Sequence, residues 1–499
     1  MTTRRHQLPS HPCKLLPSGV GLQRRVDVLA ATLRAERSTP VAVLADNCPS
    51  LALLELATQR AGRPWLPLPG FFRDAQLRQL VERCAPGTLL SDDPARLAAL
   101  LPHDSRPSQA LLGMQRFESR QARQLPGVSV LTCTSGSTGE PSVVLHRAAR
   151  LRRVARSLAT VTHMTPRDRH LAVLPLAVLL ESVGGLQRSL LAGARLIVPP
   201  LIEVGVQGSS AFDPAALDRA VRRHAATSVI LMPAQLAAWT GWLAARKVPG
   251  PATLRFVGVG GAPGPASTLE HARELGLPVS EGYGLSEAGS VLCLDSERDG
   301  PAGSVGRPLP HVQLRLAADG ELHARGALCL GYLDRSSPPR PDGWWPTGDL
   351  AERDAAGRYW IRGRKDLRFA TAFGRNVSPE WLERRLLELP GVRQAVVFGD
   401  GLPGPVALLG PGARGWSDAE RDALPRALAR TNRTLPDYAR LRAELCLPTA
   451  LDATSGLWTA TGRPRRAALW QHFGAQLSAL AEHSAGALSP TAHLETPSP

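Results

Sequence analysis

Lysine is almost absent from this chain of 499 residues. It stands only at positions 14, 247 and 365, so arginine supplies 56 of the 59 basic residues. The net charge of +16 would suit a nucleic-acid partner or an acidic membrane surface. The arginines, however, are spread along the chain without a long basic block or interleaved aromatic residues. We therefore expect no nucleic-acid partner, and a shift assay at physiological salt would test that alternative.

Cysteine and long apolar runs are scarce as well. The seven cysteines form no CxxC pair and no Cys/His cluster, which argues against a disulfide framework and a zinc site. The N-terminal segment lacks the apolar core of a signal peptide. No stretch reaches the roughly 18 uninterrupted apolar residues of a membrane span, since the best candidate, 171–180, ends at Glu181. We expect a reduced, soluble, cytoplasmic protein without a transmembrane segment.

Apolar residues are nevertheless plentiful, at 43% of the chain, and the length predicts two or more domains. Short apolar runs alternate with helical patterns through the first two thirds, as in the strand-like run 41–44 and the helical pattern 50–60. A helical pattern also covers 179–191. This alternation predicts an α/β fold with layered parallel sheets and helices on both faces.

The pattern changes at about residue 303 to short alternating stretches, with turn dipeptides at Asp319-Gly320 and Ala356-Gly357. We expect a small β subdomain that completes a large N-terminal domain over 1–364. Beyond it, helical and strand-like patterns alternate again and predict a small mobile α+β domain over 365–482. The tail 483–499 is rich in Pro, Ser, Thr and Ala, and we expect it to be disordered.

One loop carries a strong chemical signal. An apolar run at 128–131 leads into six positions filled by hydroxyl side chains and glycines. A strand that runs into such a loop presents hydroxyls and backbone N–H groups at one spot, which is an arrangement that binds polyphosphate. The loop lacks the lysine of a P-loop, and a flexible Gly/Ser turn stays open as the alternative. Its members are Thr134, Ser135, Gly136, Ser137, Thr138 and Gly139.

Five further segments follow this loop. In chain order, they begin at Glu281, Trp345, Gly363, Gly374 and Thr461. In order and spacing, the set resembles the adenylate-forming superfamily over about residues 41–468, and the version around 371–380 is most similar to fatty acyl-CoA synthetases. The resemblance implies that ATP and Mg²⁺ convert a carboxylic acid into an acyl-adenylate, which then forms a thioester with CoA or with the phosphopantetheine of an acyl carrier protein. The segments are Glu281-Gly-Tyr-Gly-Leu-Ser-Glu287, Trp345-Pro-Thr-Gly-Asp349, Gly363-Arg-Lys-Asp366, Gly374-Arg-Asn-Val-Ser-Pro-Glu380 and Thr461-Gly-Arg-Pro-Arg465.

The resemblance also implies roles for single residues. Glu287 would hold Mg²⁺, a hard cation that prefers carboxylate oxygen, although it could be a solvated loop carboxylate. Tyr283 would lie against adenine, unless it is an ordinary buried tyrosine. Ser286 stands where the family usually has threonine and keeps the catalytic hydroxyl. Gly284 belongs to the same nucleotide-binding segment.

Other implied roles concern ribose, the hinge and the thiol. Asp349 would accept hydrogen bonds from both ribose hydroxyls, unless it only stabilises a hairpin. Arg364 would reach the ribose and phosphate region. Gly260, Gly261 and Ala262 would let the backbone approach the nucleotide. Lys365 and Asp366 would form the interdomain hinge, and Gly374 would line the thiol tunnel.

Two positions depart from the family pattern. Ser142 replaces a lysine that usually follows the phosphate loop. Arg463 aligns with the lysine that bridges the substrate carboxylate and the α-phosphate, and a planar guanidinium is not an equivalent donor. Arg465 and Arg466 could also supply charge there. These departures leave open a second hypothesis, a catalytically weakened or non-catalytic protein that binds a nucleotide or an acyl group.

The acyl pocket, by resemblance, lies between 174–185, 232–239 and 257–262. Leu, Val and Ala dominate these stretches, together with Gln235 and Trp239, and ordinary core residues are the alternative for most of them. No aspartate stands at Ala177 or beside it to pair with the amino group of an amino acid. We therefore expect an apolar substrate, a fatty or aryl acid.

Overall fold

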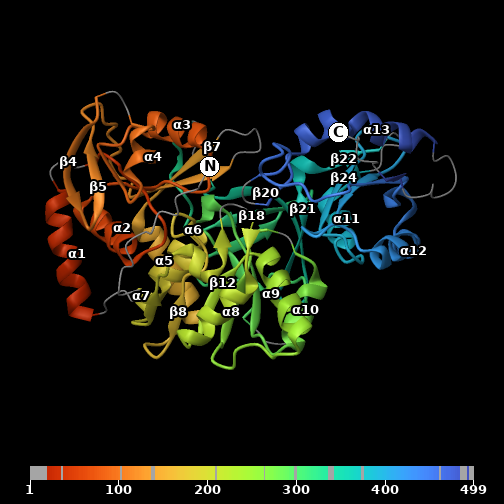
Figure 1. The fold of residues 1–499 in the computed structure, drawn as a ribbon, viewed down its shortest axis with the longest axis horizontal. Helices are drawn as coiled ribbons and strands as arrows, with labels where there is room; N and C mark the ends of the chain where they lie inside the picture. The colour runs from red at the N-terminus through yellow and green to blue at the C-terminus, as the bar shows by residue number, and fades with distance from the viewer. Residues whose placement is uncertain are drawn as a thin grey trace, which may run out of the picture.

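The computed structural model describes residues 19–34, 38–101, 104–135, 141–207, 211–262, 264–296, 300–334, 342–371, 376–459, 462–483 and 492–493. In Figure 1 the N-terminal helix lies at one end of the molecule, and the C-terminal elements, coloured blue, gather at the other end beyond β20 and β21. Two large sheets with their helices lie between these ends. The expected α/β class, with a large N-terminal and a smaller C-terminal part, is confirmed.

The first sheet has the strand order β19-β7-β6-β2-β1-β3-β5-β4. Its central strands β6, β2, β1 and β3 are parallel, and two hydrophobic cores are built on its strands. Its elements, with the helices of the same stretch, are α1 (Gly19–Leu33), β1 (Val41–Leu44), α2 (Pro49–Ala61), β2 (Trp65–Pro67), α3 (Asp74–Cys84), β3 (Thr88–Ser91), α4 (Pro94–Ala98), β4 (Arg106–Leu111), β5 (Met114–Glu118), β6 (Val130–Ser135), β7 (Pro141–His146) and β19 (Gly331–Tyr332).

The second sheet has the order β16-β15-β14-β13-β12-β8-β9, and its five strands from β14 to β9 are parallel. The helical elements of this region are α5 (Ala148–Val161), α6 (Leu179–Glu181), α7 (Arg188–Leu191), α8 (Pro214–Arg223), α9 (Pro233–Arg246) and α10 (Ala266–Glu274). Its strands are β8 (Arg169–Leu171), β9 (Arg195–Ile197), β12 (Ser228–Leu231), β13 (Phe256–Val259), β14 (Val279–Tyr283), β15 (Cys293–Leu294) and β16 (Arg307–Pro308). A short hairpin, β10 (Val206–Gln207) and β11 (Ala211–Phe212), precedes α8.

The helix expected over 179–191 forms, but it contains a π-helical turn at Ser182–Gln187. A buried hydrogen bond between a carboxylate and a histidine ring lies beside this irregular turn. Glu181 Oε1 lies 2.8 Å from His170 Nε2, and both side chains are inaccessible to solvent. A Cβ on Gly185 would stand 1.9 Å from that carboxylate oxygen. The glycine and the widened turn therefore make room for a carboxylate inside the core.

The expected β subdomain is a four-stranded antiparallel sheet of β17 (Gln313–Leu316), β18 (Glu321–Arg325), β20 (Trp345–Arg353) and β21 (Tyr359–Arg364). Both turn dipeptides join neighbouring strands as expected. A 3₁₀ turn, Lys365–Leu367, follows β21. Lys365 Nζ lies 2.6 Å from Asp319 Oδ2 and 2.7 Å from Glu321 Oε2, so two carboxylates of the β17–β18 hairpin hold the expected hinge.

The C-terminal part packs its own two hydrophobic cores around the sheet β24-β25-β26-β27. The expected domain boundaries stay predictions. In the segment for which we expect disorder, Ala492 and His493 pair with β26 at its free edge. The elements are β22 (Phe369–Ala370), β23 (Asn376–Val377), α11 (Pro379–Leu386), β24 (Gln394–Phe398), β25 (Val406–Gly410), α12 (Asp418–Thr434), β26 (Ala443–Cys446), α13 (Arg466–His483) and β27 (Ala492–His493).

Within the described ranges, no helix combines the length and the apolarity that crossing a membrane requires.

Candidate active site

The parallel strands β13 and β14 bring two motif segments to one edge of the second sheet. Val259 pairs with Glu281, so the glycines after β13 lie beside the end of β14. Carboxyl ends of parallel strands are the usual place for a ligand in such sheets. A Cβ on Gly260 would stand 2.8 Å from the Gly282 carbonyl oxygen, and Gly261 has a φ of +84°. Glycine is required at these two positions, and the main chain after β13 is therefore not covered by side chains of its own.

Gly284 turns the chain after β14 toward Glu287. A Cβ on Gly284 would lie 1.7 Å from the carbonyl oxygen of Ser290, because the loop folds back on itself. The Ser290 N–H donates to the Leu285 carbonyl, and the 3₁₀ turn Ser286–Ala288 lies inside this fold. The tight loop fixes the direction in which Ser286 and Glu287 leave the backbone.

Asp349 is the centre of a polar cluster on β20. The Tyr283 hydroxyl donates to its Oδ2 at 2.5 Å, and Arg364 Nη1 donates to its Oδ1 at 3.3 Å. Its own N–H donates to the Thr347 hydroxyl at 3.0 Å. Burial raises the pKa of Asp349, while the contacts with Tyr283 and Arg364 oppose that shift. The carboxylate is thus held by two donors that a ribose could replace.

Burial, followed by the charge of Asp349, raises the pKa of Tyr283 well above its ordinary value. The hydroxyl therefore stays protonated and acts as a donor. Tyr283 also packs on two small apolar clusters of the β subdomain. The ring of Tyr283 thus packs in an apolar environment, as expected of a buried core tyrosine, while its hydroxyl belongs to the polar cluster around Asp349.

Glu287 is held beside the strands that carry the phosphate loop. The Tyr332 hydroxyl donates to Glu287 Oε1 at 2.5 Å, and the Cys329 N–H donates to the Glu287 backbone oxygen at 2.6 Å. Tyr332 pairs with Val144 of β7, which is the partner strand of β6. Glu287 is therefore anchored and is not a freely solvated loop carboxylate.

The phosphate loop itself is described only at its ends. Thr134 pairs with Ser142 and Ser135 pairs with Pro141 across the β6–β7 hairpin. The Thr134 hydroxyl lies 3.5 Å from the Ser142 carbonyl oxygen. The four remaining predicted loop residues lie outside the described residues, as does Gly374; they are Gly136, Ser137, Thr138 and Gly139.

Arg463 comes from the C-terminal part and reaches the same edge of the second sheet. Its Nη2 donates to the Gly261 carbonyl oxygen at 2.8 Å. It lies within electrostatic range of Glu380, Arg364 and Asp349. Its N–H donates to the Thr459 hydroxyl, and the Thr459 N–H donates to its carbonyl, so a closed turn holds it. Arg466, in contrast, is paired with Glu383 inside the C-terminal part.

The structure thus brings Gly261, Tyr283, Asp349, Arg364 and Arg463 together, with Glu287 further along the loop that begins at Tyr283. Ala262 follows Gly261 and is half-buried. Asp366 pairs with Arg364 at 3.0 Å, so the expected hinge adjoins the cluster. The cluster offers a carboxylate that can accept from hydroxyl groups and two guanidinium groups that can donate to phosphate, so one ligand with both kinds of group would suit it.

Sequence reasoning missed three supporting residues. Tyr332 holds Glu287, Thr347 holds the Asp349 backbone, and the Glu380 carboxylate accepts from the Arg364 N–H. Thr347 and Glu380 belong to the motif segments, and this position in the sequence could have identified them as site residues. Tyr332 follows a glycine at an edge strand, and nothing local to it identifies its partner.

Two residues expected along the acyl pocket have structural contacts instead. Trp239 is fully buried in the core of the second sheet, and its Nε1 donates to Asp218 Oδ1 at 3.4 Å. Gln235 Oε1 accepts from the Met232 N–H at 2.9 Å and caps α9. For Trp239 these contacts favour the alternative of an ordinary core residue, because the side chain faces α8.

The donor set suits a nucleotide with Mg²⁺. In the part of the chain that the structure describes, no group of three His, Cys, Asp or Glu residues could hold a metal ion. Mg²⁺ commonly takes one or two carboxylates and completes its shell with phosphate oxygens and water, so the single anchored Glu287 fits that mode. The bare glycine backbone and the donor-held Asp349 fit a nucleoside.

Comparison with known proteins gives an independent result. The profile of the family described as AMP-binding enzyme matches residues 20–332, and that of the AMP-binding enzyme C-terminal domain matches residues 366–484. Indoleacetate–CoA ligase of Aromatoleum aromaticum is 28% identical, over 76% of this chain and 78% of its own. Fatty acid–[acyl-carrier-protein] ligase MmaC of Mycobacterium marinum is 29% identical, over 76% and 78%.

A solved structure shows the same fold. O-succinylbenzoate CoA synthetase of Bacillus subtilis in complex with its acyl-adenylate intermediate superposes with a TM-score of 0.71 at 22% sequence identity. The match covers 90% of this chain and 91% of that one.

The loop after β14 yields a test of the site's construction. We expect Gly284→Ala to lower the free energy of unfolding by about 1–3 kcal/mol, because its Cβ would overlap the Ser290 carbonyl. Gly241→Ala, in α9 with no atom near its Cβ position, is the control and should stabilise by up to about 1 kcal/mol. Denaturant unfolding of both variants gives the comparison, and equal effects would contradict the tight loop.

Proposed function

This chain belongs to the AMP-binding enzyme family and is an AMP-forming acid–thiol ligase; we propose that its acid is an apolar fatty or aryl carboxylic acid. The observation that supports the activation of an acid at this site is the reach of Arg463 to Gly261, beside the Asp349 cluster. We expect the nucleotide and the acid to meet beside this cation from the C-terminal part. The chain's departure from the family at this position keeps the charge that the chemistry needs.

The proposed mechanism divides the work among the residues of the site. ATP supplies the α-phosphorus that the acid attacks and the pyrophosphate that leaves. Asp349 would bind the ribose hydroxyls, in place of its present donors Tyr283 and Arg364. Glu287 would hold Mg²⁺, which neutralises phosphate charge. Arg463 would lower the repulsion between the substrate carboxylate and the α-phosphate.

The nature of the acid is argued from the residues and from the relatives. No carboxylate stands at Ala177 to receive an amino group, and the relatives named above act on indoleacetate and on a fatty acid. One of them is named for CoA and the other for an acyl carrier protein. The acceptor is therefore a thiol on a phosphopantetheine arm, which CoA and the carrier share. The weakened or non-catalytic alternative finds no support, because these relatives are named as ligases.

The acid class is tested with a panel of fatty, aryl and amino acids. We expect ATP-dependent pyrophosphate release, trapped with hydroxylamine, from the apolar acids and not from amino acids. Wild-type protein without acid is the control for ATP hydrolysis. Silence across the panel, in a protein that still binds ATP, would contradict the proposal.

Asp349→Ala tests the ribose contact. We expect at least about tenfold weaker ATP binding by calorimetry, because two hydrogen bonds to a charged group are lost. Glu352→Ala is the matched control, since Glu352 is an exposed carboxylate on the same strand. An unchanged ATP affinity in Asp349→Ala would remove this residue from the site.

Arg463→Ala tests the bridging cation. We expect adenylation to fall at least about a hundredfold while ATP affinity changes little, since the cation acts where the two reactants meet. Arg463→Lys should recover most of the rate because it restores the charge. Arg414→Ala, an exposed arginine of the C-terminal part, is the control. Full adenylation by Arg463→Ala would show that another group bridges the reactants.

A further inference from the structure

The Glu287 carboxylate is held by the protein through one of its two oxygens. The Tyr332 hydroxyl donates to Oε1 at 2.5 Å. Among the described residues, Tyr332 is the one donor to this side chain, and Oε2 accepts from none of them. The residue is half-buried, and Oε2 does not belong to the buried atoms that lack a partner. One oxygen is thus bound internally, and the other is left for a ligand.

The short segment between β18 and the end of β19 holds Glu287 at its backbone as well as at its side chain. The Cys329 N–H donates to the Glu287 carbonyl oxygen at 2.6 Å, three residues before Tyr332. Arg150 on α5 fixes this segment, because its Nη1 donates to the Leu328 and Cys329 carbonyls at 2.6 and 2.9 Å. Both the position and the rotation of the Glu287 carboxylate are therefore set from one segment.

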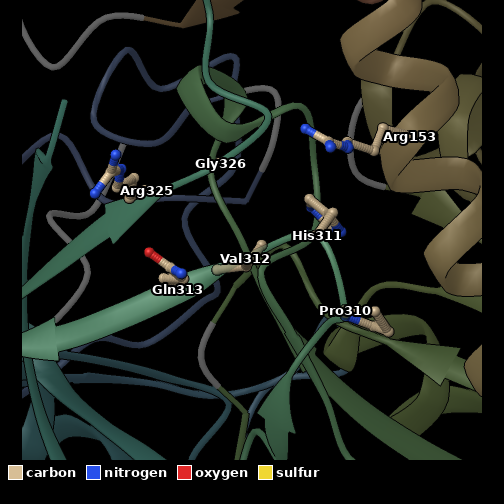
Figure 2. A pocket seen from close by; sticks show the side chains of 7 residues that line it. All are labelled: Arg153, Pro310, His311, Val312, Gln313, Arg325 and Gly326. Atoms are coloured by element: carbon tan, nitrogen blue, oxygen red, sulfur yellow. The ribbon is translucent and has the colours of Figure 1, made fainter.

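This segment is itself fixed at both ends. At its start, a Cβ on Gly326 would stand 2.3 Å from the His311 carbonyl oxygen, so two main chains touch there. Figure 2 shows that the side chain of Arg325, just before this glycine, points away from His311, which leaves the contact to the backbone. At its end, β19 adds to the edge of β7. Tyr332 therefore reaches Glu287 from a backbone that is anchored on two sides.

The ring of Tyr332 is also oriented by packing. Its centroid lies 6.3 Å from that of the Trp345 ring, with an angle of 48° between the planes. Trp345 is the first residue of β20, the strand that carries Asp349. Packing against this ring and the hydrogen bond to Glu287 both fix the direction of the phenol.

Mg²⁺ and Ca²⁺ make different demands on a carboxylate. Mg²⁺ requires near-ideal octahedral geometry and takes one or two carboxylates together with phosphate oxygens and water. Ca²⁺ takes about six to eight oxygens in a flexible shell and often binds both oxygens of one carboxylate. A glutamate whose Oε1 already accepts a hydroxyl has only Oε2 to offer without losing a hydrogen bond. That arrangement suits Mg²⁺ better than Ca²⁺.

We propose that Tyr332 is a positioning residue that keeps Glu287 a ligand through a single oxygen and thereby favours Mg²⁺ over Ca²⁺. The inference rests on the proposed function, in which Glu287 holds Mg²⁺ beside the nucleotide. Tyr332 touches neither the metal ion nor the nucleotide and acts through the carboxylate alone. Loss of its hydroxyl would free Oε1, so that Glu287 could turn and bind a larger ion through both oxygens.

Tyr332→Phe tests the proposal, because it removes the hydroxyl and keeps the ring. The full-length protein is titrated with α,β-methylene-ATP by calorimetry in buffers that contain Mg²⁺, Ca²⁺ or EDTA. We expect the ratio of the Mg²⁺ affinity to the Ca²⁺ affinity to fall about three- to tenfold. Binding in EDTA should stay unchanged, since Tyr332 acts only through the metal ligand. Tyr438→Phe, at an exposed tyrosine of the C-terminal part, is the matched control and should keep the wild-type ratio.

A second background shows whether Tyr332 acts through Glu287. When Tyr332→Phe is added to Glu287→Ala, the ratio should change no further, because the carboxylate that the hydroxyl holds is gone. A further change in this background would overturn the proposal. Equal weakening in all three buffers would overturn it too, since a structural defect acts with or without metal. Unfolding midpoints check the folding of each variant, and Tyr332→Leu is a second hydroxyl-free variant that should give the same ratio.

Failure of the proposed function would look different. Pyrophosphate release from the acid panel is measured on the same preparations in Mg²⁺. An active panel with an unchanged metal ratio in Tyr332→Phe overturns the role of Tyr332 and leaves the proposed acid standing. A silent panel with a shifted ratio removes the proposed acid and leaves the metal selectivity of the nucleotide site standing. Absence of nucleotide binding in every buffer removes both.

Discussion

The hydrogen bond from Arg463 to the Gly261 carbonyl is the contact on which the candidate site depends. It joins the C-terminal part of the chain to the carboxyl edge of the second sheet. Without it, the Asp349 cluster would have no cation from the C-terminal part beside it. The contact requires a bare backbone at Gly261, which β13 provides where it ends, and a closed turn at Thr459, which holds the arginine in place.

The sequence predicted what is encoded locally. Tyr283, Gly284 and Glu287 lie within five consecutive residues, a segment that the resemblance to a known family singled out. Apolar runs predicted parallel strands of the sheets, such as β1 at 41–44, but not the antiparallel edge strands. It did not predict Tyr332 beside Glu287, because that pairing depends on β19 adding to the edge of β7. It also missed the π-helical turn at Ser182–Gln187, which lies beside the Glu181 carboxylate that is buried against His170 of the preceding strand β8. Long-range pairing is invisible to local patterns.

The arginine-rich composition also affects the interior of the fold. Arg63 is almost fully buried, and its guanidinium donates to Thr39 and Thr88 side chains and to the Leu33 and Thr39 carbonyls. Five planar donors can satisfy several acceptors at once, which a single ammonium cannot do in the same geometry. In this chain, a guanidinium group therefore also serves to hydrogen-bond several segments of the fold to one another. Arginine at position 463 is in keeping with this usage.

The scarcity of lysine leaves the Lys365 amine as a rare chemical group at the junction of the two parts. Its contacts with Asp319 and Glu321 raise its pKa, and a protonated amine does not react with acylating reagents. Its labelling rate therefore reports how often those two carboxylates release it. With Lys247 as an exposed reference amine on the same molecule, the reactivity of Lys365 measures how tightly this junction is held, without an engineered cysteine.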